Sequence, residues 1–146
     1  MKTYTRTTFH TAILAALVTT SITALAYAQN GPKVSSTIDP DAHILTMINV
    51  LTPAHGKQAE TIQLLQAGMN QTMRQQPGFI SANIHRSLNS DHVVVYAQWK
   101  DQASVDAVVK LIQGGKAPNM ATVFTVAQPA FHPYEVISVH QAMELK

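Results

Sequence analysis

The apolar and polar positions of this chain alternate in a way that predicts four strands and two helices. Residues 43–52 are mostly apolar on both alternating faces, which is typical of a strand that is covered on both sides. In residues 57–75, apolar side chains recur at steps of three and four. Pro77-Gly78 follows, so we expect a helix that ends before this pair.

Residues 79–88 and 92–100 have the alternation of a β-hairpin, with Asn89-Ser90 as the two turn residues. Because side chains alternate with a period of two, this register places two sets of residues on one apolar face. The sets are Ile80, Ala82, Ile84, Arg86 and Leu88 on the first strand, and Val93, Val95, Ala97 and Trp99 on the second. We expect this face to contact the helices. Phe79 falls on the opposite, mixed face.

The remaining pattern predicts a second helix and a last strand. Asp101 is a suitable N-cap for a helix over residues 102–113, because its carboxylate can accept a hydrogen bond from the first turn. Residues 116–127 are ambiguous, although their apolar positions have helical spacing. A loop and a final strand are expected after them, at residues 128–130 and 131–142.

The order β-α-β-β-α-β is that of the split-βαβ, ferredoxin-like α+β fold, with one antiparallel-rich sheet and both helices on one face. The other face would carry an apolar patch of Ile44, Ile48, Val50 and Tyr96. A patch of this kind usually forms an interface. We therefore expect a symmetric homodimer that packs sheet to sheet.

Residues 1–28 have the pattern of a secretory signal peptide. Lys2 and Arg6 precede an apolar run, and Ala26-Tyr27-Ala28 fits a cleavage site after Ala28. The apolar run is shorter than the ~20 residues of a spanning helix, which disfavours a stable membrane anchor. We expect a secreted or periplasmic protein with a polar linker over 29–42 and one domain over 43–142.

Charge and composition exclude several functions. Without the signal peptide, the chain has eight basic and eight acidic residues, so a basic surface for nucleic acid is not expected. There is no cysteine, which excludes thiol catalysis and zinc–thiolate sites. The histidines lack the spacing of a metal site, and we expect no protein-bound metal.

Several separated blocks resemble the antibiotic biosynthesis monooxygenase domain of the dimeric α/β-barrel superfamily. The blocks are Pro77-Gly78-Phe79, His85-Arg86-Ser87, residues 95–101 and residues 132–136, and they occur in the family's order. The resemblance covers roughly residues 43–141 and implies a dimeric α/β barrel. It also implies an oxygenase without a bound metal, flavin or other cofactor. The substrate, a small quinol- or anthrone-like aromatic, would itself react with O2.

The resemblance implies Asn49 and Trp99 as catalytic residues. Asn is disfavoured within a strand, so Asn49 either contacts the substrate or is satisfied by the backbone. Trp99 would form a pocket wall, or pack as a core tryptophan. Arg86 shares the predicted Trp99 face and would neutralise an anion, or lie in solvent. Other residues would line the substrate pocket or pack in the core: Met69, Met73 and Phe124, with Met120 and Phe131.

Two other functions fit the same fold. One is a non-catalytic periplasmic dimer that binds an aromatic ligand, because the sequence has no evident acid–base pair. The other is haem binding or degradation. Haem-degrading relatives carry an iron-ligating His on the helix after the tryptophan, and residues 102–113 contain none. The monooxygenase is therefore the leading hypothesis.

Overall fold

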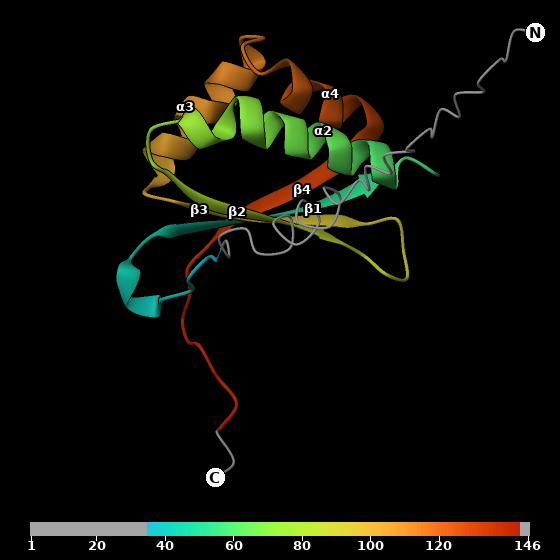
Figure 1. Ribbon diagram of the computed structural model, residues 1–146. Coiled ribbons are helices and arrows are strands. Elements are labelled where there is room, and N and C mark those ends of the chain that lie inside the picture. The colour runs from blue at the N-terminus through green and yellow to red at the C-terminus, as the bar shows by residue number, and fades with distance from the viewer. Residues whose placement is uncertain (1–34, 144–146) are drawn as a thin grey trace, which may run out of the picture. The chain divides into compact units, whose positions relative to one another are not determined.

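The computed structural model describes residues 35–143, and from Ser36 onward these form one compact unit. A four-stranded antiparallel sheet has the order β2-β3-β1-β4. This confirms the ferredoxin-like fold (Figure 1). The elements are β1 (Leu45–Pro53), α2 (Gln58–Gln71), β2 (Phe79–Arg86), β3 (Val93–Trp99), α3 (Gln102–Gln113), α4 (Pro118–Val126) and β4 (Ala127–Tyr134). Two short 3₁₀ helices, η1 (Pro40–Ala42) and η2 (Met73–Gln75), precede β1 and follow α2.

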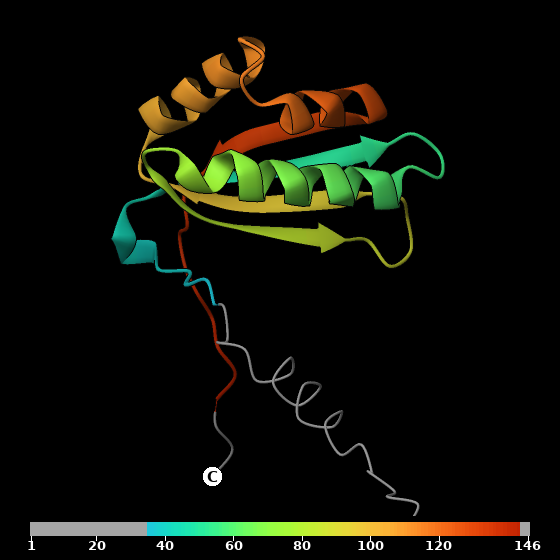
Figure 2. The same ribbon diagram turned by 45° about the horizontal axis from the view of Figure 1, so that its top comes forward.

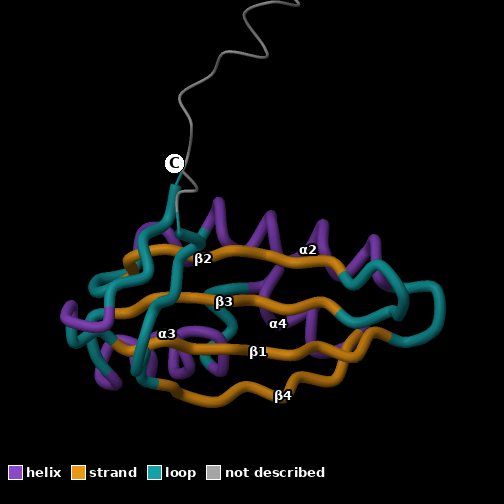
Figure 3. Tube along the Cα trace, turned by 90° about the horizontal axis from the view of Figure 1, so that it is seen from below, coloured by secondary structure: helices purple, strands orange, loops and turns teal. Residues whose placement is uncertain are grey.

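The three α-helices lie on one face of the sheet, as the sequence predicts for the helices it identifies (Figure 2). Seen from the other side, the four strands are not covered by any helix (Figure 3). We call this uncovered side the open face. Between sheet and helices lies the hydrophobic core, where Leu51, Leu65 and Val123 are almost fully buried. Each such side chain stabilises the fold by about 1.5–3 kcal/mol.

The hairpin register is confirmed over most of its length but broken at its start. Ala82 pairs with Ala97 and Ile84 with Val95, as predicted. A β-bulge between Phe79 and Ser81 then shifts the pairing by one residue, so that Phe79 faces Trp99. The prediction that Ile80 lies beside Trp99 is therefore wrong, since a bulge exchanges the faces of the residues beyond it.

The bulge has two consequences for side-chain packing. The rings of Phe79 and Trp99 meet edge to face with centroids 5.2 Å apart, while Ile80 is 48% exposed. At the other end of the hairpin, β2 stops at Arg86. Leu88, predicted on the same apolar face, is instead 96% exposed beyond the strand.

Asp101 caps α3 as the sequence predicts, and α3 has the predicted bounds. Its Oδ1 accepts hydrogen bonds from the Ser104 amide at 2.9 Å and from the Ser104 hydroxyl at 2.7 Å. The hydroxyl and then the amide of Ser104 lower the pKa of the Asp101 carboxyl below its ordinary value of 3.8, because both stabilise the charged form.

Substituting Asp101→Ala is expected to lower the melting temperature at neutral pH, since the first turn of α3 loses its cap. A carboxyl with a depressed folded pKa stabilises the fold above its unfolded pKa, and this contribution disappears as the pH falls through the folded pKa. The gap in melting temperature between wild type and variant should therefore shrink below pH 3.8. Circular dichroism melts across this range test the expectation, and a gap that stays constant contradicts it.

The C-terminal elements correct two predictions. The ambiguous segment contains a helix, α4, with Pro118 in its first turn. The predicted loop at 128–130 belongs to β4, which ends at Tyr134 rather than continuing to residue 142. Proline disfavours a strand interior, but β4 is an edge strand, where a residue without an N–H is tolerated on the outer side.

Part of the predicted linker docks on the open face. Thr37 O accepts a hydrogen bond from Gln98 Nε2 at 2.8 Å, and Ser36 Oγ accepts one from Asn83 Nδ2 at 3.0 Å. The predicted signal peptide lies outside the described residues. Within residues 35–143, no helix is long and apolar enough to cross a membrane.

Candidate active site

A cavity of about 490 Å³ lies between the sheet and the helix layer. Its volume is in the usual range for small-molecule sites. The sheet contributes Met47, Asn49, Val95, Ala97, Trp99, Pro129 and Phe131. The helices and η2 contribute Leu65, Met69, Met73, Val105, Val108, Val109, Ile112, Gln113, Met120, Ala121 and Phe124.

Asn49 is the polar side chain that β1 places in this cavity. Alternate residues of β1 face the helices, and Asn49 shares this face with Met47 and Leu51. Its Oδ1 atom is buried and has no hydrogen-bond partner. An unsatisfied buried acceptor costs about 1–3 kcal/mol. The backbone does not satisfy this oxygen, so a bound molecule that donates a hydrogen bond would remove the cost.

Trp99 lies at the far end of the same wall. It is 6% exposed and is held by the edge-to-face contact with Phe79. Asn49 pairs with Val95, so four residues of β3 separate its position from Trp99. At the usual rise of a strand this is about 13 Å. The two predicted catalytic residues therefore line one cavity from different positions along it.

Four methionines contribute to the cavity wall. Met47, Met69, Met73 and Met120 come from four different elements and all line it. α2 and α4 approach each other closely here. A Cβ atom on Gly68 would lie 2.7 Å from Met120 Cγ, so this position has no room for a side chain. Unbranched thioether side chains adapt to irregular shapes and contact aromatic rings favourably. The wall therefore suits a flat apolar ligand.

No ionisable side chain of the described residues lines this cavity. Gln113, at the C-terminal end of α3, supplies a second amide beside that of Asn49. Arg86 lies outside the lining and is exposed at the end of β2. The structure therefore gives no support to the predicted role of Arg86 in binding an anion.

The structure brings together five of the six predicted site residues, namely Asn49, Trp99, Met69, Met73 and Phe124. Sequence reasoning missed Met47 and Gln113. The position of Met47, two residues before Asn49, could have revealed it, because such residues share a strand face. Nothing in the sequence singles out Gln113, which enters the site only through the angle of α3.

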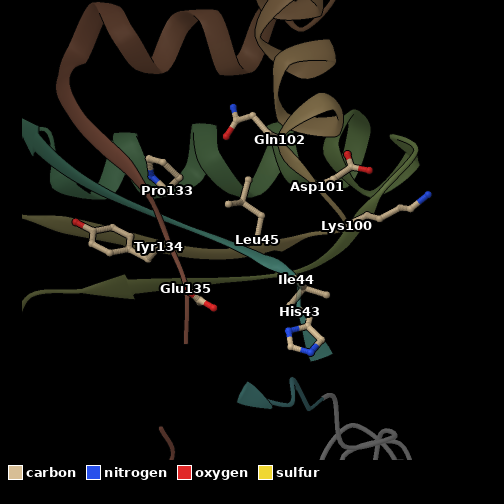
Figure 4. Close-up of a pocket in the computed structure, with 9 residues that line it drawn as sticks. All are labelled: His43, Ile44, Leu45, Lys100, Asp101, Gln102, Pro133, Tyr134 and Glu135. Carbon is tan, nitrogen blue, oxygen red and sulfur yellow. The ribbon is translucent and has the colours of Figure 1, made fainter. Parts of the chain in front are cut away.

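A second cavity of about 430 Å³ lies where β1, β4 and the start of α3 meet. Its charged side chains are Lys100, Asp101 and Glu135, and they point in different directions (Figure 4). Asp101 is already engaged in capping α3. Within residues 35–143, no three His, Asp or Glu residues are arranged to hold a metal ion. The cavity that contains Asn49 is therefore the candidate active site.

Comparison with known proteins agrees with this fold. Residues 44–111 match the model of the antibiotic biosynthesis monooxygenase family. Over 73 residues, the chain is 37% identical to the tetracenomycin-F1 monooxygenase of Streptomyces glaucescens. This alignment covers 50% of the chain and 65% of that relative, so it leaves about a third of the relative unmatched. The match of residues 44–111 to this family agrees with the family resemblance of their sequence pattern.

Solved structures show the same fold at low sequence identity. A variant of SnoaB, a cofactor-independent oxygenase from Streptomyces nogalater, superposes with a TM-score of 0.56 at 22% identity. The superposition covers 66% of this chain and 95% of SnoaB. A conserved protein from Methanosarcina mazei gives a TM-score of 0.53 at 14% identity, with coverage of 64% and 94%.

Proposed function

We propose that this protein is a cofactor-independent monooxygenase that oxidises a small, flat aromatic molecule with O2 in the cavity of Asn49 and Trp99. The related tetracenomycin-F1 monooxygenase and the structurally similar SnoaB, a cofactor-independent oxygenase, support the reaction class. The observation that carries the proposal is the unpartnered Asn49 Oδ1 inside a largely apolar cavity that no ionisable side chain of the described residues lines. Quinols and anthrones offer the hydroxyl group and the apolar rings that such a site would take.

The amide of Asn49 fits both protonation states of such a substrate. Its Oδ1 can accept a hydrogen bond from a neutral phenol. A half-turn of the amide presents Nδ2 as a donor to a phenolate or enolate. Because the site is apolar, a hydrogen bond to the anion is strong there, and the anion is the species that gives an electron to O2.

The oxidation balances without a further reductant. When a CH2 group of an anthrone becomes C=O, one atom of O2 enters the product. The other atom leaves as water with the two hydrogens of the CH2 group. Since no ionisable side chain of the described residues lines the cavity, the substrate itself would lose its first proton to water. The protein would supply desolvation, orientation and the amide of Asn49.

We also propose that the protein acts as a homodimer that packs through the open face. Ile48, Tyr96 and the 38%-exposed Val50 lie on this face, away from the helices. Pro129 and Pro133 disfavour the alternative of pairing through the edge of β4. Light scattering tests the proposal, and a monomer at micromolar concentration contradicts it.

Export to the periplasm or the exterior is the remaining part of the proposal. It rests on the pattern of residues 1–28, with cleavage after Ala28. N-terminal sequencing of the protein recovered from the expressing cell is expected to begin at Gln29. A recovered chain that still begins at Met1 contradicts it.

Trp99 is the only tryptophan of the chain, so its fluorescence reports on the cavity alone. A neutral anthrone or quinol is expected to quench this emission on binding and to consume O2 afterwards. The fluorescence titration and an oxygen electrode measure the two steps separately. Naphthalene, which lacks the hydroxyl group, is the matched ligand and should bind less tightly without turnover. No oxygen uptake with any anthrone or quinol contradicts the proposed reaction.

A non-catalytic binding protein is the second candidate, because no ionisable side chain of the described residues lines the cavity. It predicts the same quenching of Trp99 by neutral aromatics but no oxygen uptake. The two functions therefore differ only in the second measurement.

A further inference from the structure

Among the glycines of the described residues, Gly68 is the one that lies inside a helix. It is buried in the last turn of α2, where Thr72 N–H donates to Gly68 O at 3.0 Å as in an ordinary helix. Such a position does not need a glycine for its backbone conformation, and alanine would strengthen the helix. What matters at Gly68 is therefore the space that its missing side chain leaves.

The side chain of Met120 fills this space. α2 and α4 lie side by side in the helix layer (Figure 1). A Cβ atom on Gly68 would lie 2.7 Å from Met120 Cγ and closer still to Met120 Sδ. The Met120 backbone N would be 3.5 Å away, which is an ordinary contact. The obstacle to a side chain at residue 68 is therefore the thioether end of Met120, and not the backbone of α4.

The free space beside Met120 is the candidate active site. Met120 lines the cavity of about 490 Å³ that contains Asn49. Its neighbours on the same side of α4 leave no other room, because Ala117 and Val123 are each 0% exposed in the packed core. Methionine has an unbranched side chain with three rotatable bonds, so it changes its conformation at a small cost. A Met120 thioether displaced from Gly68 would therefore enter the cavity.

We propose that Gly68 and Met120 together set the size of the ligand that this cavity accepts. Gly68 receives the thioether end of Met120 against α2 and so keeps it out of the cavity. A side chain at residue 68 would turn the thioether inward, which would exclude a wide ligand and leave room for a narrow one. Because it concerns the same cavity, the inference rests on the proposed function and adds a determinant of ligand size to it.

Substituting Gly68→Ala tests the proposal, since one methyl group displaces Met120. Calorimetric titrations in oxygen-free buffer measure binding without turnover, with anthrone as the wide ligand and hydroquinone as the narrow one. One methylene group in an apolar pocket changes discrimination between ligands by roughly 10- to 200-fold. We therefore expect the dissociation constant of anthrone to rise about tenfold or more in the variant. The dissociation constant of hydroquinone should not change.

Two further variants separate the size of the cavity from other effects of the substitution. Gly68→Ala combined with Met120→Ala keeps the methyl group but has no thioether to displace, so anthrone binding should recover. Gln66→Ala changes an exposed residue of the same helix and should bind both ligands as the wild type does. An equal loss for both ligands, or no loss for anthrone, overturns the proposal. A Gly68→Ala chain that does not fold also overturns it, because Met120 then finds no place in the cavity.

A crystal structure of the Gly68→Ala variant tests the position of Met120 without any ligand. We expect Met120 Sδ inside the cavity and a smaller cavity volume than in the wild type. A Met120 side chain that turns to solvent and leaves the volume unchanged overturns the proposal. A wild-type protein that binds neither anthrone nor hydroquinone contradicts the proposed function instead. In that case the position of Met120 in the variant decides alone whether Gly68 sets the size of the cavity.

Discussion

Substituting Asn49→Leu is expected to stabilise the fold and to remove turnover. The two side chains have similar volumes, and leucine carries no polar atom into the cavity wall. Because Asn49 Oδ1 is buried without a partner, its removal should raise the free energy of unfolding by about 1–3 kcal/mol. The amide is also the proposed contact to the substrate anion. Losing one such contact lowers kcat by about 10²- to 10³-fold.

Urea unfolding and oxygen uptake on the same preparations measure the two effects. Asn83→Leu is the matched control, because Asn83 is also a strand asparagine but lies on the open face. Its Nδ2 donates to Ser36 Oγ, so its loss should cost stability and leave kcat unchanged. A destabilised Asn49→Leu variant with normal turnover would show that the amide serves the fold and not the reaction.

We expect Asn49→Leu to raise the free energy of unfolding and Asn83→Leu to lower it. This contrast shows what the sequence can predict about the site. Alternation along β1 places Asn49 toward the helices, and the hairpin register places Trp99 on the same side. These two regularities suffice to place both residues on the helix-covered face of the sheet. They do not reveal that Asn49 Oδ1 lacks a partner, because this depends on every side chain around it.

Local backbone irregularities explain where the fold departs from the pattern. The bulge after Phe79 adds one residue to β2, and no apolar or polar alternation encodes it. It moves Phe79, and not Ile80, against Trp99. The strand through Pro129 was missed for a related reason. A proline excludes a central strand but not an edge strand, and edge position is known only from the whole sheet.

The cavity itself could not be predicted from the sequence. Met69, Met73 and Phe124 have the spacing of ordinary core residues, and a filled core and a hollow one use the same apolar pattern. What differs is the distance of the helix layer from the sheet. Arg86 was predicted to line the site but does not. The alternation places it on the same face of the sheet as Trp99, but it lies where β2 ends, and its side chain is exposed to solvent.

Substituting Trp99→Ala is expected to be the most destabilising change in the site. Trp99 is 6% exposed, packs against Phe79 and belongs to the hydrophobic core. Truncating a buried aromatic side chain to alanine costs about 3–5 kcal/mol. A domain of this size is stable by about 5–15 kcal/mol in total, so the variant should approach the limit of folding. The midpoint of urea unfolding, followed by circular dichroism, measures the loss.

Trp99→Phe separates the role of Trp99 in packing from any role in catalysis. Phenylalanine keeps an aromatic ring against Phe79 but has no indole N–H, so most of the stability lost in Trp99→Ala should return. If Trp99 only forms a wall, kcat returns with it. If its N–H donates to the substrate, kcat stays low although the unfolding midpoint is largely restored. The second result is expected for a catalytic residue, and a full recovery of both quantities would reduce Trp99 to a packing role at the end of the cavity.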